Sequence, residues 1–153
     1  MKQARALVAA ALLAAAAPLA VAVESDPVEK VASDPDVVAA RKAHDRGDWK
    51  EAVARLQRAE RRFPRDADLQ NSLGYALRQA KDYDGAFRHY RKALQFDPRH
   101  RGAHEYIGEA YLLVGDVASA EKHLASLKSI CMLPCEEMRE LEKAIGEYKA
   151  RKP

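Results

Sequence analysis

The chain has 153 residues, of which 48% are hydrophobic and 32% charged, and its net charge is +3. Lysine and arginine alternate with aspartate and glutamate along most of its length, which is typical of solvated helix faces. Nucleic-acid binding needs a concentrated basic surface, so the composition argues against that class of partner. The sequence also lacks a Gly-rich phosphate loop.

The first 22 residues have the pattern of a secretory signal peptide. Lys2 and Arg5 precede an apolar run over residues 6–17, and Ala20-Val21-Ala22 is a small-x-small cleavage sequence. The run falls short of the roughly 20 apolar residues of a membrane helix, so we expect no stable membrane insertion after cleavage. The Ala- and Arg-rich composition is typical of a high-GC bacterium, and together these features predict a periplasmic or secreted protein.

Two short segments flank the predicted folded part. Residues 23–32 contain few bulky apolar side chains and are expected to form a flexible leader, and residues 150–153 a frayed tail. Without residues 1–22 the chain has 24 Lys and Arg against 23 Asp and Glu, a net charge of +1.

Residues 33–134 repeat three times with a period of 34 residues, in the units 33–66, 67–100 and 101–134. Matching positions share size or charge: position 8 is Ala40, Gly74 and Gly108, position 16 is Asp48, Asp82 and Asp116, and position 20 is Ala52, Ala86 and Ala120. A period in this range indicates stacked helical hairpins, each too small to bury its apolar face alone.

Each unit is predicted to form a helix, a turn and a second helix. The first helices are expected near 35–46, 67–80 and 101–114, and the second near 49–62, 83–96 and 117–130. Gly47-Asp48 and Gly115-Asp116 can end one helix at glycine and cap the next at aspartate, whereas Lys81-Asp82 keeps only the cap. Small residues at positions 8 and 20 let the paired helices approach to about 8–10 Å.

The pattern resembles the tetratricopeptide repeat. The second unit carries it most fully, with Leu73-Gly74, Leu77, Tyr83, Ala86, Tyr90, Ala93 and Pro98. Position 4 departs from the family, since Asp36, Gln70 and His104 replace the usual aromatic residue. The resemblance implies an all-α fold, a right-handed superhelical stack of three helix-turn-helix units that binds other proteins.

Residues 135–149 are predicted to form a seventh, capping helix. Met138, Leu141, Ile145 and Tyr148 fall on one stripe, with charged residues elsewhere. An open stack needs such a polar-backed helix to cover its last apolar face.

The resemblance also implies a concave groove lined by the first helices. Its candidate partner-binding residues are Arg41, His44, Asn71, Tyr75, Arg78, Glu105, Glu109 and Leu112, with Asp45, Asp68, Gln79 and Leu113 beside them. This surface grades from mixed and basic to acidic and apolar, which suits an extended peptide or a partner helix. The family's carboxylate-clamp residues are absent at the matching positions.

Cys131 and Cys135 are the only thiols, and in an exported protein they are expected to form a structural disulfide. A redox role, or a copper site that includes Met132, is the alternative hypothesis. His100 and His104 lie four residues apart without a third ligand nearby, so we expect no metal site. We also expect no cofactor and no enzymatic activity, because no nucleophile and base stand at helical spacing.

The sequence therefore predicts a protein–protein interaction scaffold or adaptor in the cell envelope. The competing class is a redox or metal-handling protein that uses Cys131 and Cys135. A third hypothesis is self-association through the concave face or the first helix.

Overall fold

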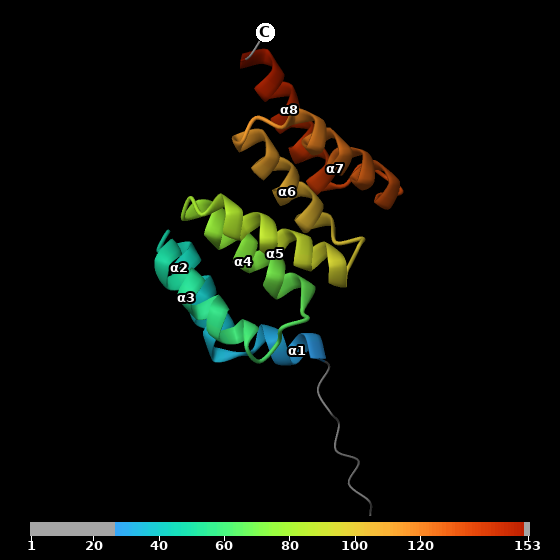
Figure 1. The fold of residues 1–153 in the computed structure, drawn as a ribbon. Helices are drawn as coiled ribbons and strands as arrows, with labels where there is room; N and C mark the ends of the chain where they lie inside the picture. The colour runs from blue at the N-terminus through green and yellow to red at the C-terminus, as the bar shows by residue number, and fades with distance from the viewer. Residues whose placement is uncertain (1–26, 152–153) are drawn as a thin grey trace, which may run out of the picture.

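The computed structural model describes residues 27–151, which form eight helices stacked in one direction (Figure 1). They are α1 (Pro27–Ala32), α2 (Pro35–Asp45), α3 (Trp49–Glu60), α4 (Ala67–Gln79), α5 (Tyr83–Phe96), α6 (Arg101–Leu113), α7 (Val117–Ile130) and α8 (Glu136–Arg151). Within residues 27–151, no helix combines the length and apolar character required to traverse a bilayer. The predicted signal peptide, residues 1–22, lies outside the described residues.

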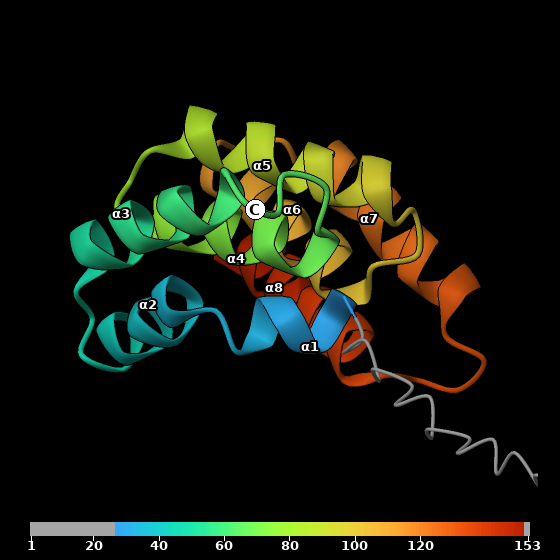
Figure 2. The same cartoon turned by 90° about the horizontal axis from the view of Figure 1, so that it is seen from below.

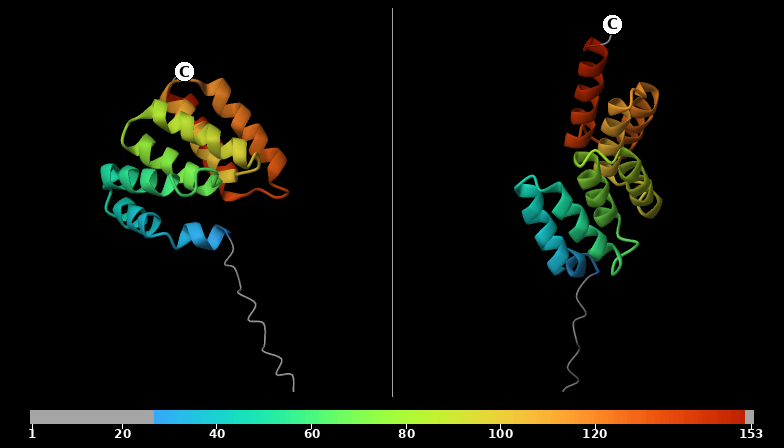
Figure 3. Two further views of the ribbon diagram at one scale, coloured as in Figure 1. Left: turned by 60° about the horizontal axis from the view of Figure 1, so that its bottom comes forward. Right: turned by 60° about the vertical axis from the view of Figure 1, so that its left-hand side comes forward.

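The helices form two layers. Figure 2 shows α3, α5 and α7 in the outer layer and α2, α4, α6 and α8 in the inner one. Each unit is an antiparallel pair, and the pairs follow one another along the stack (Figure 3). The predicted all-α repeat stack is confirmed, and the helix bounds agree with the expected ones within one or two residues.

The turns inside the units use the predicted local chemistry. The carboxylates of Asp48, Asp82 and Asp116 accept hydrogen bonds from backbone N–H groups three residues later, at 3.1, 2.9 and 3.0 Å. Gly47 and Gly115 adopt φ values of 69° and 84°, which glycine tolerates without strain. Lys81 adopts the same left-handed conformation, with φ 66°, so the geometry of the turn persists where the glycine is missing.

The expected leader and tail are partly helical. Residues 27–32 of the leader form α1, and Val31 packs against the core while its carbonyl accepts from Asp34 N at 3.1 Å. At the other end, α8 continues to Arg151, beyond the predicted end of the capping helix. In both places a short stretch with weak local signals becomes helical beside packed neighbours.

The buried residues form two clusters. The larger joins α2 to α6, and the smaller consists of Leu112, Ala120, Leu124, Leu127, Leu141 and Ile145. A Cβ atom at Gly108 would lie 2.6 Å from Leu141 Cδ2. The missing side chain at Gly108 therefore makes room for α8, and not for its own partner helix α7 as predicted. At Gly74 the neighbour is Tyr90, on the partner helix as predicted. The capping role expected of α8 therefore includes covering the inner face of α6.

Position 4, where the sequence departs from the family pattern, carries a polar side chain that pairs with a residue 19 positions later. Asp36 Oδ1 accepts from Arg55 Nη1 at 3.3 Å, Gln70 Oε1 lies 2.7 Å from His89 Nδ1, and His104 Nδ1 lies 2.9 Å from His123 Nδ1. In the second and third units the same side chain also reaches a proline carbonyl. Gln70 Nε2 donates to Pro64 O at 3.1 Å, and His104 Nε2 lies 3.1 Å from Pro98 O. The contacts with the proline carbonyls connect the second and third units to the turns that precede them.

The pair in the third unit consists of two titratable rings. Burial lowers the pKa of His104, and burial together with the neighbouring His104 lowers the pKa of His123 to about 4. An unfolded histidine titrates near 6.5. Between these values the unfolded chain binds the proton more tightly, so stability is complete above about pH 6.5 and declines as the pH falls toward 4.

We therefore expect His123→Gln to flatten the acid loss of stability. Glutamine can keep a hydrogen bond to His104 but cannot be protonated, so the wild type should lose about 2 kcal/mol more than the variant between pH 7.5 and pH 5. Urea unfolding at the two pH values measures the difference. Equal slopes for wild type and His123→Gln would contradict the assignment.

Candidate functional site

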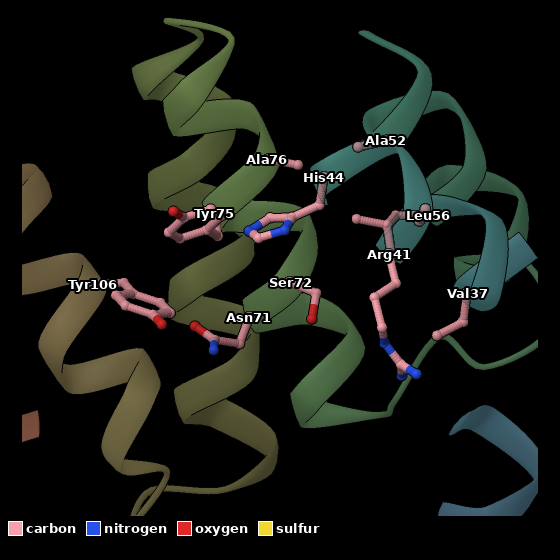
Figure 4. Close-up of a pocket in the computed structure, with 11 residues that line it drawn as sticks. Val37, Arg41, His44, Ala52, Leu56, Asn71, Ser72, Tyr75, Ala76 and Tyr106 are labelled. Atoms are coloured by element: carbon pink, nitrogen blue, oxygen red, sulfur yellow. The ribbon is translucent and has the colours of Figure 1, made fainter. Parts of the chain in front are cut away.

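The inner layer contains a pocket between α2 and α4 with a volume of about 350 Å³ (Figure 4). Its apolar wall is formed by Val37, Ala40, Ala52, Leu56 and Ala76, and its polar rim by Arg41, His44, Asn71, Ser72, Tyr75 and Tyr106. Residues from three successive units meet here: each unit contributes side chains of its first helix, and Ala52 and Leu56 of α3 complete the wall. The pocket is thus a product of stacking and belongs to no single hairpin.

A row of aromatic rings runs along the pocket from α2 to α6. The centroids of His44 and Tyr75 lie 5.6 Å apart, and those of Tyr75 and Tyr106 5.1 Å apart. Trp49 of α3 supports the row from behind, with its ring 5.2 Å from His44 and 5.9 Å from Tyr75. In Figure 4 the Tyr75 and Tyr106 rings lie next to each other, with His44 directed toward Tyr75. The rings give the groove a rigid apolar surface with polar edges.

Arg78 lies beside this row and is held by the protein itself. Its guanidinium group sits 5.3 Å from the Tyr75 ring and 5.5 Å from the Tyr106 ring, and Nη1 pairs with Glu109 Oε2 at 2.5 Å. The Arg78 side chain is only 9% exposed. Arg78 therefore connects α4 to α6 and presents little of its charge to the groove.

Three buried polar atoms near the seam between α4 and α6 have no hydrogen-bond partner among residues 27–151. They are Asn71 Oδ1, Arg78 Nε and Tyr90 Oη. Burial is the main cause that raises the pKa of the Tyr90 hydroxyl far above its usual value, while nearby Arg78 opposes the shift. A buried donor or acceptor without a partner is costly, and such atoms gather at sites that bind waters or ligands.

Glu105 extends the groove beyond Tyr106. Burial, together with the nearby charges of Glu109 and Glu137, raises the pKa of its carboxyl group to about 7. Glu105 makes no salt bridge within the part of the chain that the structure describes. The carboxylate is therefore half-buried, beside like charges, and without a cation of its own.

The structure brings most of the predicted groove residues to the inner face. Arg41, His44, Asn71 and Tyr75 line the pocket, and Arg78, Glu105 and Glu109 continue the same face. Leu112 does not line the groove. It is 8% exposed and belongs to the core cluster around Leu141, because α8 covers this end of α6. The neighbouring Leu113 is 58% exposed.

The residues predicted to lie beside the groove do not line the pocket, and other residues that do line it were not predicted. Asp45 and Asp68 pair with His44 at 3.3 Å and His100 at 3.0 Å, and Gln79 is half-buried. The groove prediction missed Val37, Ser72 and Tyr106, which line the pocket. A usable signal was present, since Val37 occupies the same repeat position as Asn71 and Glu105, and Ser72 the same position as Tyr106.

Cys131 and Cys135 are joined by a disulfide in the structure, with their Cα atoms 6.0 Å apart. The bond links the end of α7 to the residue before α8, and the loop between them exposes Met132 and Leu133. Residues 27–151 contain no group of three or more His, Cys, Asp or Glu side chains placed to hold a metal ion.

Comparison with known proteins identifies the repeat. Two family models, both described as tetratricopeptide repeat, match residues 37–100 and 77–130. No curated protein sequence matches the chain at the significance required of a relative.

Solved structures share the fold at low sequence identity. The TPR2B domain of yeast Sti1, in complex with pHsp70, is 19% identical with a TM-score of 0.66, over 76% of this chain and 95% of that one. The type III secretion translocator chaperone SycD of Yersinia enterocolitica, in an alternative dimer, is 20% identical with a TM-score of 0.67, over 85% and 97% of the two chains. SycD with a peptide of the translocator YopD gives 20% identity and a TM-score of 0.66, over 86% and 98%.

Proposed function

The chain belongs to the tetratricopeptide repeat family, and we propose that it is an interaction scaffold or adaptor whose concave groove holds a peptide or a partner helix. The observation that carries the proposal is the pocket between α2 and α4, where an apolar wall adjoins the rings of Tyr75 and Tyr106. Preformed concave surfaces with aromatic anchors and a few polar groups are typical of binding sites.

The structural neighbours support this proposal. The Sti1 domain is in complex with pHsp70, and SycD with a peptide of YopD, so proteins of this fold hold protein or peptide partners. The groove here offers the same kind of surface: a rigid row of rings, the exposed side chains of Arg41 and His44 at the rim, and Asn71 beside them. The proposal is therefore of an interaction module rather than an enzyme.

Filling the pocket should remove partner binding without harming the fold. Ser72 is exposed and lies at the rim, so Ser72→Phe would place a ring in the cavity without entering the core. We expect the variant to bind its partner at least about tenfold more weakly, a loss of about 1.4 kcal/mol. A crosslinking pull-down from the host's envelope fraction, followed by titration of the captured partner, measures the loss.

Ser129→Phe is the matched control, because Ser129 is also an exposed helical serine but lies on α7, away from the pocket. Both variants should melt within about 2 °C of the wild type, since surface substitutions usually change stability by less than about 0.5 kcal/mol. Capture of the same partner with the same affinity by Ser72→Phe and Ser129→Phe would contradict the groove assignment.

We further propose that the protein is exported and that its disulfide forms in the cell envelope. Residues 1–22 have the signal-peptide pattern, and oxidising compartments favour bonds such as Cys131–Cys135. The intact mass of protein from the host should correspond to a chain beginning at Val23, with no thiol that reacts before reduction. A chain that keeps Met1 would contradict export. Two thiols that react before reduction would instead favour the redox or copper-handling alternative.

A further inference from the structure

The side chains at one repeat position of the groove change from apolar to polar to acidic along the stack. Repeat position 5 is occupied by Val37, Asn71 and Glu105, on α2, α4 and α6. Val37 and Asn71 both line the pocket, so Glu105 is the next member of the same row. A segment lying across the inner helices would therefore meet an apolar surface first, an amide next and a carboxylate last.

The apolar end is large enough for a bulky side chain. The pocket of about 350 Å³ is walled by Val37, Leu56 and alanine methyl groups. Its volume falls in the lower part of the range of about 300–1,000 Å³ found for ligand pockets. Arg41 and His44 lie at its rim and are exposed to solvent.

The acidic end has more carboxylates than cations. Glu105 lies near Glu109 on its own helix and near Glu137 and Glu140 on α8, and these charges act with burial to raise the pKa of Glu105 to about 7. The two neighbouring guanidinium groups are both engaged, Arg78 with Glu109 at 2.5 Å and Arg101 with Glu137 at 3.5 Å. Four carboxylates thus face two cations, which leaves Glu105 and Glu140 without an ion-pair partner among the described residues.

The two ends are a short peptide apart. Helices that pack directly are separated by about 8–10 Å, and taking this as the minimum spacing of the inner helices places the pocket between α2 and α4 about one and a half spacings from α6. An extended chain rises by about 3.3 Å per residue. Four or five residues of extended chain span this distance, and the reach of a long side chain widens the range to about three to six.

We infer that the groove binds an extended segment that places a large apolar side chain in the α2–α4 pocket and a lysine or arginine side chain against Glu105, about three to six residues away. The inference rests on the proposed function, since it specifies the occupant of the same groove. The proposed occupant is a polypeptide with a basic side chain, because Glu105 is half-buried and has no cation of its own.

Selection of random dodecapeptides displayed on phage against the purified protein tests this chemistry directly. The wild type should enrich peptides that combine a large apolar residue with a lysine or arginine at the stated spacing. Glu105→Gln should lose the preference for the cation and keep the apolar one. Glu121→Gln, which removes an exposed carboxylate of α7, is the control and should select the wild-type pattern.

A selected peptide then supplies a quantitative check. Its affinity, measured by fluorescence anisotropy, should fall about tenfold from pH 8 to pH 6, because Glu105 must be ionised to hold the cation and its pKa in the free protein is about 7. A peptide with norleucine in place of the basic residue should lack this dependence, as should binding to Glu105→Gln. Titration of a histidine at the rim would instead leave the dependence unchanged in Glu105→Gln.

The outcomes separate the two levels of the proposal. If no peptide is enriched on the wild type, or if enriched peptides still bind Ser72→Phe, the proposed groove function fails. If peptides are enriched and blocked by Ser72→Phe but show no cation preference, or if that preference survives in Glu105→Gln, the present inference alone is overturned.

Discussion

Replacing Arg78 with glutamate should lower the free energy of unfolding by about 3–5 kcal/mol, the usual cost of breaking a buried ion pair. The Arg78 side chain is 9% exposed and is the cation that faces both Glu109 and the rings of Tyr75 and Tyr106. The new carboxylate would stand among Glu105, Glu109 and the electron-rich ring faces. Repulsion and the loss of the cation–π contacts would then act in the same direction.

Urea unfolding at pH 7.5 measures this effect, and two further variants interpret it. Arg88→Glu reverses an exposed charge on α5 and should change stability by only about 0.5 kcal/mol. The double variant Arg78→Met/Glu109→Gln removes both charges and should recover much of the loss, since an uncompensated charge is the main penalty. An unfolding midpoint for Arg78→Glu equal to that of Arg88→Glu would contradict the buried clamp. That result would indicate that Arg78 is free to contact a partner in the groove.

Replacing Gly74 with leucine should be destabilising by about 3 kcal/mol, at the upper end of the usual cost of overpacking. A Cβ atom at this position would lie 2.6 Å from Tyr90 Cδ1 and 2.7 Å from Cε1. Tyr90 is fully buried, so its ring has no free space into which to move. The gain in helix propensity, about 0.8 kcal/mol, is too small to offset the collision.

Gly146→Leu is the matched control for Gly74→Leu. Gly146 lies within α8, and a Cβ atom there would meet nothing within 4 Å. The substitution should therefore raise stability by roughly the propensity difference of 0.8 kcal/mol. Thermal or urea unfolding of the two variants should show shifts of opposite sign. If Gly74→Leu were as stable as the wild type or more so, the close contact between α4 and α5 at Gly74 would be contradicted.

The helices and the turns inside each unit could be predicted because their signals are local. An aspartate such as Asp48 caps a helix through an amide three residues away, and Gly47 supplies the left-handed conformation beside it. These interactions occur within a few residues and recur with the 34-residue period, so each unit repeats the evidence. The period itself predicts stacking, since an isolated hairpin cannot bury its apolar face.

The groove was predicted less completely, because exposure depends on neighbouring helices. Four of the predicted residues, Arg41, His44, Asn71 and Tyr75, line the pocket. Leu112 occupies an equivalent register to His44 and Arg78 but is covered by α8. A repeat position predicts which way a side chain faces within its own unit. Whether that side chain is exposed to solvent depends on where the next helix packs.

The sequence by itself determined the helical units, their order and the face that each first helix turns inward, because periodic apolar residues and capping side chains act over short distances. Only the tertiary structure decided that Arg78 clamps α4 to α6, that His104 meets His123, and that Glu105 is left without a cation. Each of these depends on residues about 20 or more positions apart, or on the charges that α8 brings to the inner face. Such distances are set by how whole helices pack, and packing is a property of all their side chains together.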